Sequence, residues 1–324
     1  MSDVVFYEAF EEEQQALKRY LPSEIHADFI RETIQETDAR QAPASLVCIR
    51  TQSVVPVAWA VQMKGLLTRS TGYDHLVEYR LKGGRKIAYG YLPAYCSRAV
   101  AEQAMLMLLA LSRKLPRQMN QMKLFCRDGL MGRELFGKRL LVVGIGRIGR
   151  ECVSIAKGLG MKVKGVDLEK REEDVDYVPL DQGLRWADAV ICSLPLTSAT
   201  RDLLNYAAFS LSRPGLLFVN VGRGEVSPLG DMQLALSQGL LAGAALDVYP
   251  QEQETATALR REGRQAEIFK TLERMMKEHN VLFTPHNAFN TEESVERKAQ
   301  QTIESVVSFL KKGFFVDGIP TKSE

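Results

Sequence analysis

Three residues far apart in the sequence, Arg223, Glu252 and His286, have side chains suited to acid–base chemistry on a carbonyl acid. An arginine can bind a carboxylate through two parallel hydrogen bonds and polarise an adjacent carbonyl group. Histidine titrates near neutral pH, so it can supply a proton to an alkoxide that forms on reduction. A carboxylate that is hydrogen-bonded to an imidazole raises the pKa of the imidazole and fixes its orientation. These residue types predict proton transfer coupled to reduction.

Each of the three residues follows a strand-like run. Arg223 lies in NVGRG, Glu252 ends LDVYPQE, and His286 lies in FTPHN. Open α/β sheets hold their ligands at the carboxyl ends of their strands, so these segments are expected to meet there. Asp247, at the end of its strand, is expected to contact a cofactor or to cap the loop. Taken alone, Arg223 is as readily a surface residue in a glycine turn, and a lone histidine is more often structural. The other histidines are interpreted as structural: His26, His75 and His279.

A glycine-rich segment, GIGRIG, spans residues 144–149, directly after the strand-like run Leu140–Val143 and before a helix-like pattern. In such a segment Gly144 permits a tight turn, Gly146 lets the backbone approach a pyrophosphate, and Gly149 lets helix and strand pack closely. The N-terminus of the helix adds unpaired N–H groups and partial positive charge. The segment therefore predicts a dinucleotide site.

Asp167 ends the next strand-like run, 21 residues after Gly146 (167 − 146 = 21). An acid at about this offset accepts hydrogen bonds from the adenosine ribose of a dinucleotide. Its charge would repel a 2′-phosphate, which favours NAD over NADP, although Lys170 and Arg171 could weaken that exclusion. The alternative is an ordinary glycine turn with a surface aspartate.

Six strand-like runs surround these motifs, and helix-like segments separate most of them. They are Arg139–Val143, Lys162–Asp167, Ala189–Leu194, Leu216–Val221, Ala242–Val248 and Val281–Thr284. This alternation predicts βαβ units in a doubly wound parallel sheet with helices on both faces. Shorter runs at Val4–Phe6, Ser45–Ile49, Leu66–Leu67 and Ile87–Ala88, with a helix-like pattern at Glu11–Tyr20, predict a second, smaller sheet.

Three further segments complete the expected organisation. The pattern of Ala99–Lys114 predicts a long, mostly apolar helix that Pro116 stops and that could bridge two domains. The charged stretch Gln251–His279 predicts a solvated helical excursion. Glu292–Lys312 predicts an amphipathic C-terminal helix ended by Gly313. The expected domains are residues 1–97 with 288–324, which bind substrate, and residues 98–287, which bind the dinucleotide.

Composition limits the kind of partner. The chain has 324 residues, 45% hydrophobic and 25% charged, which fits two globular domains with a cleft between them. The net charge of +2 is spread along the chain, so no basic face for nucleic acid or membrane is expected. The run Ala99–Leu111 is too short to span a bilayer, and the acidic N-terminus is unlike a signal peptide. Five separated cysteines without a CxxC pair suggest no metal site and a reducing cytoplasm.

The order of these motifs resembles the D-isomer-specific 2-hydroxyacid dehydrogenases, and the resemblance extends from Arg69 to Gly313. The glycine loop, N-x-x-R-G, D-V-x-x-x-E and T-P-H follow one another as in that family, with 29 residues from arginine to glutamate (252 − 223 = 29). The resemblance implies that Arg223 binds and polarises the substrate, that Glu252 supports His286, and that His286 is the acid–base. It also implies NAD, a 2-keto acid substrate and a homodimer.

The resemblance implies further binding residues. RSTGYD, residues 69–74, is similar to the family loop whose backbone amides receive the substrate carboxylate, which makes Thr71, Gly72 and Tyr73 candidates. PAYCSRAVAE resembles the D-lactate dehydrogenase branch, where the tyrosine, here Tyr95, faces the substrate; a packed aromatic is the alternative. The expected cofactor-binding residues are Gly144, Gly146, Arg147, Ile148, Gly149, Asp167, Leu194, Pro195, Thr200, Val221, Gly222 and Asp247.

One departure concerns the substrate, because Asn290 stands where the lactate branch has an aromatic residue, typically tyrosine. This argues against pyruvate as the preferred substrate. The expected fold class is α/β with two Rossmann-like domains, a doubly wound parallel sheet for NAD and a smaller flavodoxin-like substrate domain. The expected function is NAD-dependent reduction of a small 2-keto acid to the D-2-hydroxy acid. A corepressor-like NAD-sensing protein is the alternative. Formate or phosphite oxidation is disfavoured because formate oxidisers have glutamine in place of Glu252.

Overall fold

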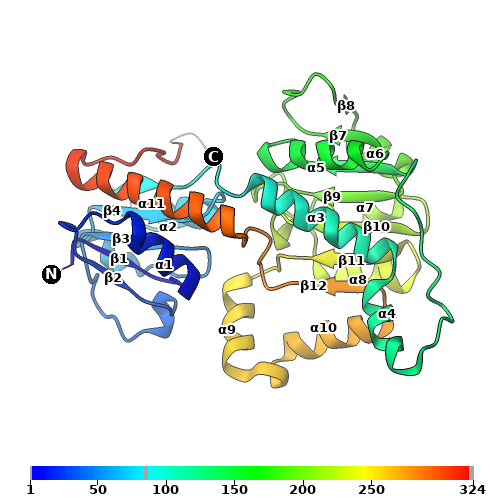
Figure 1. Ribbon diagram of the computed structural model, residues 1–324, viewed down its shortest axis with the longest axis horizontal. Coiled ribbons are helices and arrows are strands. Elements are labelled where there is room, and N and C mark those ends of the chain that lie inside the picture. The colour runs from blue at the N-terminus through cyan, green and yellow to red at the C-terminus, as the bar shows by residue number, and fades with distance from the viewer. Residues whose placement is uncertain (1, 84–86, 321–324) are drawn as a thin grey trace. The chain divides into compact units, whose positions relative to one another are not determined.

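The computed structural model describes residues 2–83 and 87–320. The chain divides into two compact units: unit 1 comprises Met1–Cys96 and Asn290–Glu324, and unit 2 comprises Ser97–Phe289. Each unit is built on its own parallel sheet (Figure 1). The α/β fold class predicted from the sequence is therefore confirmed.

The sheet of unit 1 has five parallel strands in the order β2-β1-β3-β4-β5. The strands are β1 (Val4–Phe6), β2 (Ala27–Phe29), β3 (Leu46–Ile49), β4 (Gly65–Thr68) and β5 (Ala88–Gly90). β3 and β4 are buried along their whole length, as continuous apolar runs are when both faces of a parallel sheet are covered. From β1 the chain first adds β2 on one side and then β3 on the other. The winding direction of this sheet thus changes between β1 and β3.

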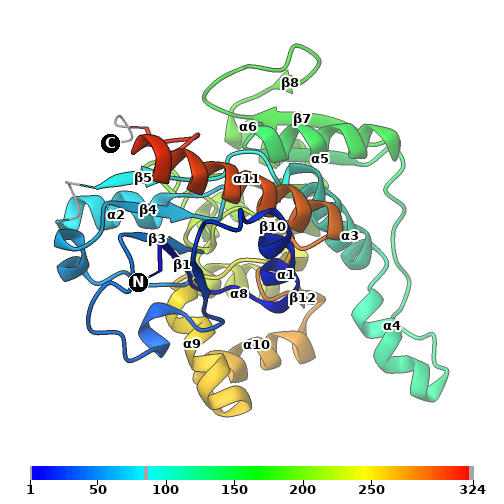
Figure 2. The same ribbon diagram turned by 60° about the vertical axis from the view of Figure 1, so that its left-hand side comes forward.

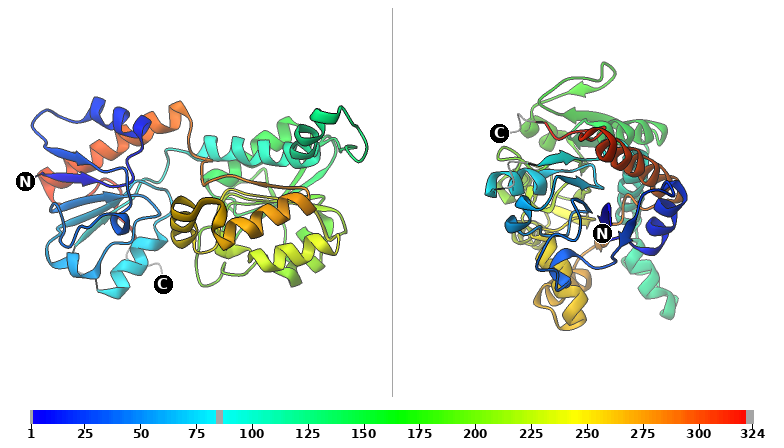
Figure 3. Two further views of the ribbon diagram at one scale, coloured as in Figure 1. Left: turned by 90° about the horizontal axis from the view of Figure 1, so that it is seen from below. Right: turned by 90° about the vertical axis from the view of Figure 1, so that its left-hand side faces the viewer.

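Helices cover both faces of this sheet. They are α1 (Glu11–Tyr20), α2 (Asp74–Lys82) and α11 (Glu292–Lys312), with 3₁₀ turns η1 (Ile34–Glu36) and η2 (Val57–Val61). Figures 1 and 2 show α1 beside α11, and the two helices are in contact. Figure 3 shows α2 on the opposite face. The Thr291 hydroxyl caps α11, and Gly313, with φ of +80°, ends it as predicted.

The sheet of unit 2 has seven parallel strands in the order β12-β11-β10-β9-β6-β7-β8. The strands are β6 (Arg139–Val143), β7 (Lys162–Val166), β8 (Asp176–Tyr177), β9 (Ala189–Cys192), β10 (Leu216–Asn220), β11 (Leu241–Leu246) and β12 (Val281–Phe283). All six predicted strands are present, and the short edge strand β8 was not predicted. The chain winds one way from β6 to β8 and the other way from β9 to β12. This is the doubly wound arrangement expected from the sequence.

Helices lie on both faces of the sheet of unit 2 (Figure 3). They are α3 (Ser97–Ser112), α4 (Leu115–Gln121), α5 (Arg147–Gly158), α6 (Leu180–Trp186), α7 (Tyr206–Ser210), α8 (Leu229–Ser237), α9 (Glu252–Glu262) and α10 (Glu267–Glu278). Short 3₁₀ turns accompany them: η3 (Met122–Leu124), η4 (Gly224–Val226) and η5 (Gly263–Gln265). α3 contacts α5 and the strands β10 to β12 on one face. The other face carries a core that includes residues of α6, α7, α8 and α10.

Two predicted helical segments differ from the structure. The helix predicted to run from Ala99 to Lys114 ends at Ser112, because Lys114 takes a left-handed conformation and the next helix, α4, begins at Leu115 with Pro116 in its first turn. The charged segment Gln251–His279 forms two helices, α9 and α10. Helix α10 is amphipathic rather than exposed to solvent on all sides, since its Leu272 and Met275 are buried in the core. Among the described residues, no helix has the length and apolar character needed to cross a membrane.

Three fully buried charged side chains join α1, α11 and the end of β4 in unit 1. The Glu13 carboxylate lies 2.6 Å from the Lys298 ammonium and 3.0 Å from Nε of Arg69. Burial by itself would raise the pKa of Glu13, but the positive charges of Arg69, Lys298 and Arg50 together lower it to about 2. Burial lowers the pKa of Lys298 to about 7, although Glu13 opposes this. Glu13 therefore holds two cations inside the unit.

Replacing Glu13 with glutamine leaves those two cations without their carboxylate. We expect Glu13→Gln to lower the free energy of unfolding by about 3–5 kcal/mol at neutral pH, as when a buried pair loses one partner. Because the pKa of Glu13 is lower in the folded chain, at about 2, than its ordinary value of 4.5, its stabilisation is complete above that ordinary value. It is lost as the pH falls towards the folded value.

Denaturant unfolding across this acidic range measures both effects. Glu12→Gln, which changes an exposed neighbour on the same helix, is the control. If Glu13→Gln retained the acid sensitivity of the wild type, the buried carboxylate would not be its source.

Candidate active site

The glycine loop joins β6 to α5. Gly144 has φ of +94°, which permits the turn. A Cβ on Gly149 would lie 1.9 Å from the carbonyl oxygen of Gly144, so α5 could not pack against this loop with any larger residue. A Cβ on Gly146 would meet nothing within 4 Å, and this open side lies at the N-terminus of a helix of 12 residues. An anionic group such as a pyrophosphate fits this cradle.

Asp167 lies directly after β7, beside the glycine loop. One carboxylate oxygen accepts a hydrogen bond from the Ile145 amide at 2.6 Å, and the other accepts one from the Glu169 amide at 3.1 Å. Each carboxylate oxygen can accept more than one hydrogen bond, so the group can also serve a ligand hydroxyl. Asp167 thus has the place and the acceptor capacity that ribose binding requires.

The predicted cofactor residues after β9 and β10 lie on two loops that touch. A Cβ on Gly222 would lie 2.5 Å from the carbonyl oxygen of Leu194, and one on Gly144 would lie 3.1 Å from the Leu194 side chain. The Thr200 hydroxyl donates a hydrogen bond to the Pro195 carbonyl at 2.7 Å, which fixes the first of these loops. The strands β6, β9 and β10 are neighbours in the sheet, so these residues line its carboxyl edge together.

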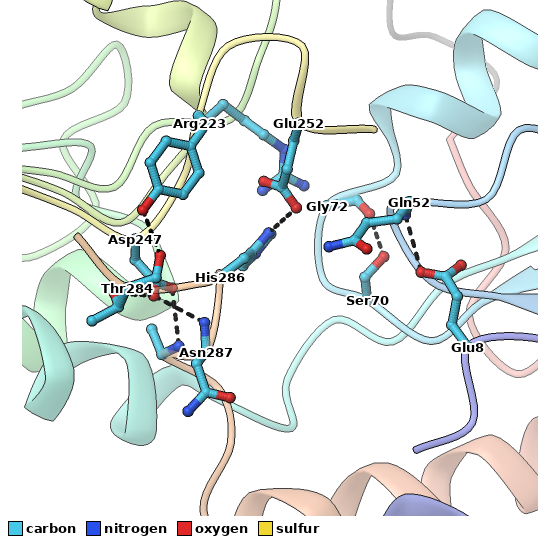
Figure 4. A network of polar contacts seen from close by, with 12 residues as sticks. Glu8, Gln52, Ser70, Gly72, Arg223, Asp247, Glu252, Thr284, His286 and Asn287 are labelled. Carbon is cyan, nitrogen blue, oxygen red and sulfur yellow. Dashed lines mark hydrogen bonds and ion pairs between the residues drawn. The ribbon is translucent and has the colours of Figure 1, made fainter. Parts of the chain in front are cut away.

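His286 and Glu252 form a hydrogen bond at this edge. Nδ1 of His286 lies 2.6 Å from the Glu252 carboxylate, and the two side chains are 20% and 17% exposed (Figure 4). Glu252 is the first residue of α9, and His286 follows β12. With Nδ1 bonded to the carboxylate, Nε2 is the nitrogen that can exchange a proton with a ligand.

The loop that carries His286 is anchored by the buried carboxylate of Asp247. Its oxygens accept hydrogen bonds from the Thr284 hydroxyl at 2.5 Å and from the amides of Asn287 and Ala288 at 2.9 Å each (Figure 4). His286 itself has φ of +52°, a strained conformation for a residue with a Cβ. Of the two roles considered for Asp247, cofactor contact and loop capping, the structure supports capping directly.

Arg223 lies between β10 and η4 on a braced turn. The Asn220 side chain accepts a hydrogen bond from the Gly222 amide at 3.0 Å and donates one to the Arg223 carbonyl at 2.9 Å. A Cβ on Gly224 would lie 1.9 Å from the carbonyl carbon of Tyr249, so this turn presses against the segment that leads to Glu252. Figure 4 shows the side chains of Arg223, Glu252 and His286 extending toward one another. The structure thus brings the side chains of Arg223, Glu252 and His286 close together.

Glu225, which the sequence analysis did not single out, joins the arginine turn to the glutamate segment. Its carboxylate accepts a hydrogen bond from the Gln251 amide at 3.1 Å. Gln251 is left-handed, with φ of +50°, and immediately precedes Glu252. In the sequence Glu225 is simply an acidic residue directly after Arg-Gly. Its contact with Gln251 could not be predicted, because the two residues meet only in the folded chain. Glu225 thus holds the residue that precedes Glu252.

The predicted substrate residues of unit 1 lie in the loop between β4 and α2. The Ser70 hydroxyl donates a hydrogen bond to the Gly72 carbonyl at 2.7 Å, and the Thr71 hydroxyl lies 3.4 Å from Sγ of Cys96. Tyr73 is the N-cap residue of α2, and its ring meets that of Tyr91 edge to face. The loop therefore has a fixed shape, with the amides of residues 71–73 after the end of a buried strand.

Tyr95 is buried within unit 1. It is only 4% exposed, and the Lys298 ammonium lies 5.7 Å from the centre of its ring. Its carbonyl oxygen accepts hydrogen bonds from Arg297 at 2.9 Å and from the Ser294 hydroxyl at 3.3 Å. This placement favours the packed aromatic over the residue that faces a substrate.

Comparison with known proteins places these motifs in context. Residues 105–288 match the model of the family described as D-isomer specific 2-hydroxyacid dehydrogenase, NAD binding domain. A D-lactate dehydrogenase of Curvularia clavata is 31% identical over 300 residues, which cover 88% of this chain and 82% of the relative. An aromatic 2-oxoacid reductase of Clostridium sporogenes is 32% identical over 259 residues, or 78% of this chain and 77% of the relative.

A solved structure has the same architecture over nearly the whole chain. D-lactate dehydrogenase from Aquifex aeolicus, complexed with NAD and lactic acid, is 28% identical, with a TM-score of 0.83. The alignment covers 97% of this chain and 98% of that one. These similarities agree with the resemblance that the motifs indicated.

The contact between Glu225 and Gln251 predicts a functional effect. Glu225→Ala frees the residue before Glu252, and we expect kcat to fall about tenfold, the equivalent of one hydrogen bond to a charged acceptor. Glu225→Gln keeps a carbonyl oxygen and should restore most of the activity. Steady-state kinetics measure this, with the exposed Glu262→Ala as the control. Equal losses in the alanine and glutamine variants, or a loss in KM alone, would contradict the positioning role.

Proposed function

Since the chain belongs to the D-isomer specific 2-hydroxyacid dehydrogenases, in the D-lactate dehydrogenase-like branch, we propose that Arg223, Glu252 and His286 perform its NAD-dependent reduction of a 2-keto acid. The hydrogen bond between Glu252 and His286, beside Arg223 at the carboxyl edge of unit 2, is the observation that carries this proposal. The product is the D-2-hydroxy acid.

Each of the three side chains has a distinct task. The Arg223 guanidinium binds the substrate carboxylate and polarises the keto oxygen. NAD, held at the glycine loop, would supply in its reduced form the hydride that reduces the keto carbon. Nε2 of protonated His286 donates its proton to the oxygen as negative charge develops there. Glu252 stabilises the imidazolium before the transfer and keeps Nδ1 as the bonded nitrogen, so that Nε2 faces the substrate.

The glycine loop and Asp167 are the proposed NAD-binding groups. The open side of Gly146 and the first amides of α5 fit the pyrophosphate. Asp167, after β7, is the proposed acceptor for the ribose hydroxyls. In unit 1, the amides of Thr71, Gly72 and Tyr73 are proposed to receive the substrate carboxylate, which a fixed turn of backbone N–H groups can do.

We also propose a homodimer, formed through an apolar surface of unit 2. Apolar side chains are exposed on and after the helices α3 and α4, at Leu106, Leu109, Leu115, Met119, Met122, Leu124, Phe125, Met131 and Phe136. Figure 2 shows α4 extending away from the sheet of unit 2. Monomers rarely expose so many neighbouring large apolar groups, and a second copy of the chain would cover them.

A cytoplasmic location is proposed on the basis of the cysteines. All five lie in the described part of the chain, all are free, and four of them are buried. Reduced thiols are usual in the cytosol, where glutathione keeps disulfides from forming.

His286→Ala tests the catalytic assignment. Loss of the proton donor should lower kcat by about 10²- to 10⁴-fold, the usual contribution of general acid catalysis. NADH binding, measured by fluorescence titration, should stay within about twofold, because His286 lies outside the glycine loop. Turnover is followed by loss of NADH absorbance with pyruvate, phenylpyruvate and hydroxypyruvate. An unchanged kcat would remove His286 from the mechanism.

The dimer is tested by charging its proposed surface. Leu106→Arg combined with Leu124→Arg should convert the protein to a monomer in analytical ultracentrifugation, because buried unpaired charges oppose association. Val61→Arg, at a position 90% exposed in unit 1, is the control. Dimers in the double variant, or monomers in the wild type, would refute this surface.

A further inference from the structure

Three hydrogen bonds in series cross the loop between β4 and α2. Nε2 of His75 lies 3.0 Å from the Thr68 hydroxyl, which lies 2.6 Å from the Ser70 hydroxyl. The Ser70 hydroxyl in turn donates to the Gly72 carbonyl at 2.7 Å (Figure 4). Thr68 is the last residue of β4, and His75 is the second residue of α2. These four residues form the His75 network, which joins the two ends of the loop proposed for the substrate carboxylate.

The direction of donation within the His75 network follows from its hydrogens. Each hydroxyl carries one hydrogen, so it can donate only one hydrogen bond. The hydrogen of Ser70 goes to the Gly72 carbonyl, so the Ser70 oxygen accepts from Thr68. Because the hydrogen of Thr68 is then used, the Thr68 oxygen accepts from Nε2 of His75. Nε2 therefore carries a hydrogen, whether the ring is neutral or protonated.

The two hydroxyls of the His75 network are shielded from water. Thr68 is fully buried and Ser70 is 7% exposed, so water competes little for their hydrogens. In such surroundings hydrogen bonds are stronger, and each bond in a series polarises the next. The His75 ring is partly exposed, so it is the donor that begins the series from the side nearer to solvent. A change at His75 is therefore expected to reach Gly72 through the two hydroxyls.

The His75 network orients the peptide plane between Gly72 and Tyr73. This peptide is trans and planar, so its N–H points away from its C=O. Ser70 holds the C=O, and this fixes the direction of the Tyr73 N–H. In the part of the chain that the structure describes, the amides of residues 71–73 donate to no other group. They are thus available to an anion, and the partial positive charge at the start of α2 favours one there.

We propose that His75 is a positioning residue that, through Thr68 and Ser70, fixes the Tyr73 amide for the substrate carboxylate. This inference rests on the proposed function, in which that amide receives the carboxylate. Without a donor at His75, the Thr68 oxygen could accept the hydrogen of Ser70. The Gly72 carbonyl would then share that hydrogen with Thr68, and the Tyr73 amide would lose its fixed direction. His75 thus acts by setting the direction of donation in the network.

Steady-state kinetics test the role of His75, with NADH and whichever of pyruvate, phenylpyruvate and hydroxypyruvate is reduced fastest. We expect Ser70→Ala to raise KM for the keto acid about 5- to 10-fold, the equivalent of one hydrogen bond. Because the carboxylate is bound alike before and during reaction, kcat should change less than about threefold. His75→Leu should raise KM about 3- to 10-fold, whereas His75→Gln, which keeps an N–H donor, should stay within about twofold of the wild type. His26→Leu, at a side chain 80% exposed in the same unit, is the control and should change neither constant.

A double variant separates this role from a merely structural one. Thr68→Val removes the oxygen that would compete for the hydrogen of Ser70, so Ser70 can donate only to Gly72. Adding Thr68→Val to His75→Leu should therefore bring KM back to within about threefold of the wild type, as coupled neighbours in one network can do. Two independent structural losses would instead make the double variant worse than either single variant.

Three kinetic results would overturn the inference: an unchanged KM in His75→Leu, a loss confined to kcat, or a double variant with the largest KM. If the wild type reduces no 2-keto acid, the proposed function fails instead. Crystal structures of the wild type and of His75→Leu then decide on the network. A Ser70 hydroxyl that moves from the Gly72 carbonyl to Thr68 in the variant supports the role of His75, and one that keeps its contact with Gly72 overturns it.

Discussion

The buried carboxylate of Asp247 is the interaction on which the geometry of the site depends. It is 1% exposed at the end of β11, and it holds the loop after β12 through three hydrogen bonds. Hydrogen bonds to a charged group contribute about 1.5–3 kcal/mol each, whereas a left-handed residue with a Cβ costs about 1–3 kcal/mol. Asp247 can therefore maintain the strained backbone of His286. That conformation brings Nδ1 of His286 to the Glu252 carboxylate. The hydrogen bond between them then fixes the direction in which Nε2 points.

Glycines at two close approaches extend this constraint across the sheet. Gly222 lies against the loop of Leu194, and Gly224 lies against the carbonyl of Tyr249. A side chain at either position would separate two of the loops that follow β9, β10 and β11. The loop that carries Arg223 thus packs, backbone against backbone, on the loop of Leu194 and on the segment that leads to Glu252. The geometry of the site therefore depends on glycine at positions 222 and 224 as well as on the residues proposed to react.

Signals that are local in the sequence predicted most of the fold and the triad. The apolar runs gave the strands of the larger sheet, and the glycine spacing with Asp167 gave the dinucleotide loop, because each depends on residues close together in the chain. Contacts between residues that are far apart in the sequence could not be predicted from such local patterns. Glu13 meets Lys298, and Glu225 meets Gln251, only because the fold brings them together. Tyr95 and Lys298 are likewise far apart in the sequence and meet only in the fold.

The two ends of the chain share unit 1, and this has a consequence for how the protein folds during synthesis. Residues 1–96, with Glu13 and Arg69, are synthesised before α11 and Lys298. Unit 2 is continuous, so it can fold while unit 1 still lacks a helix that covers one face of its sheet. Unit 1 can reach its native packing only after α11 has been made. Until then the face of its sheet that α11 covers, where Gly65 packs against Phe309, stays exposed on the nascent chain and can aggregate.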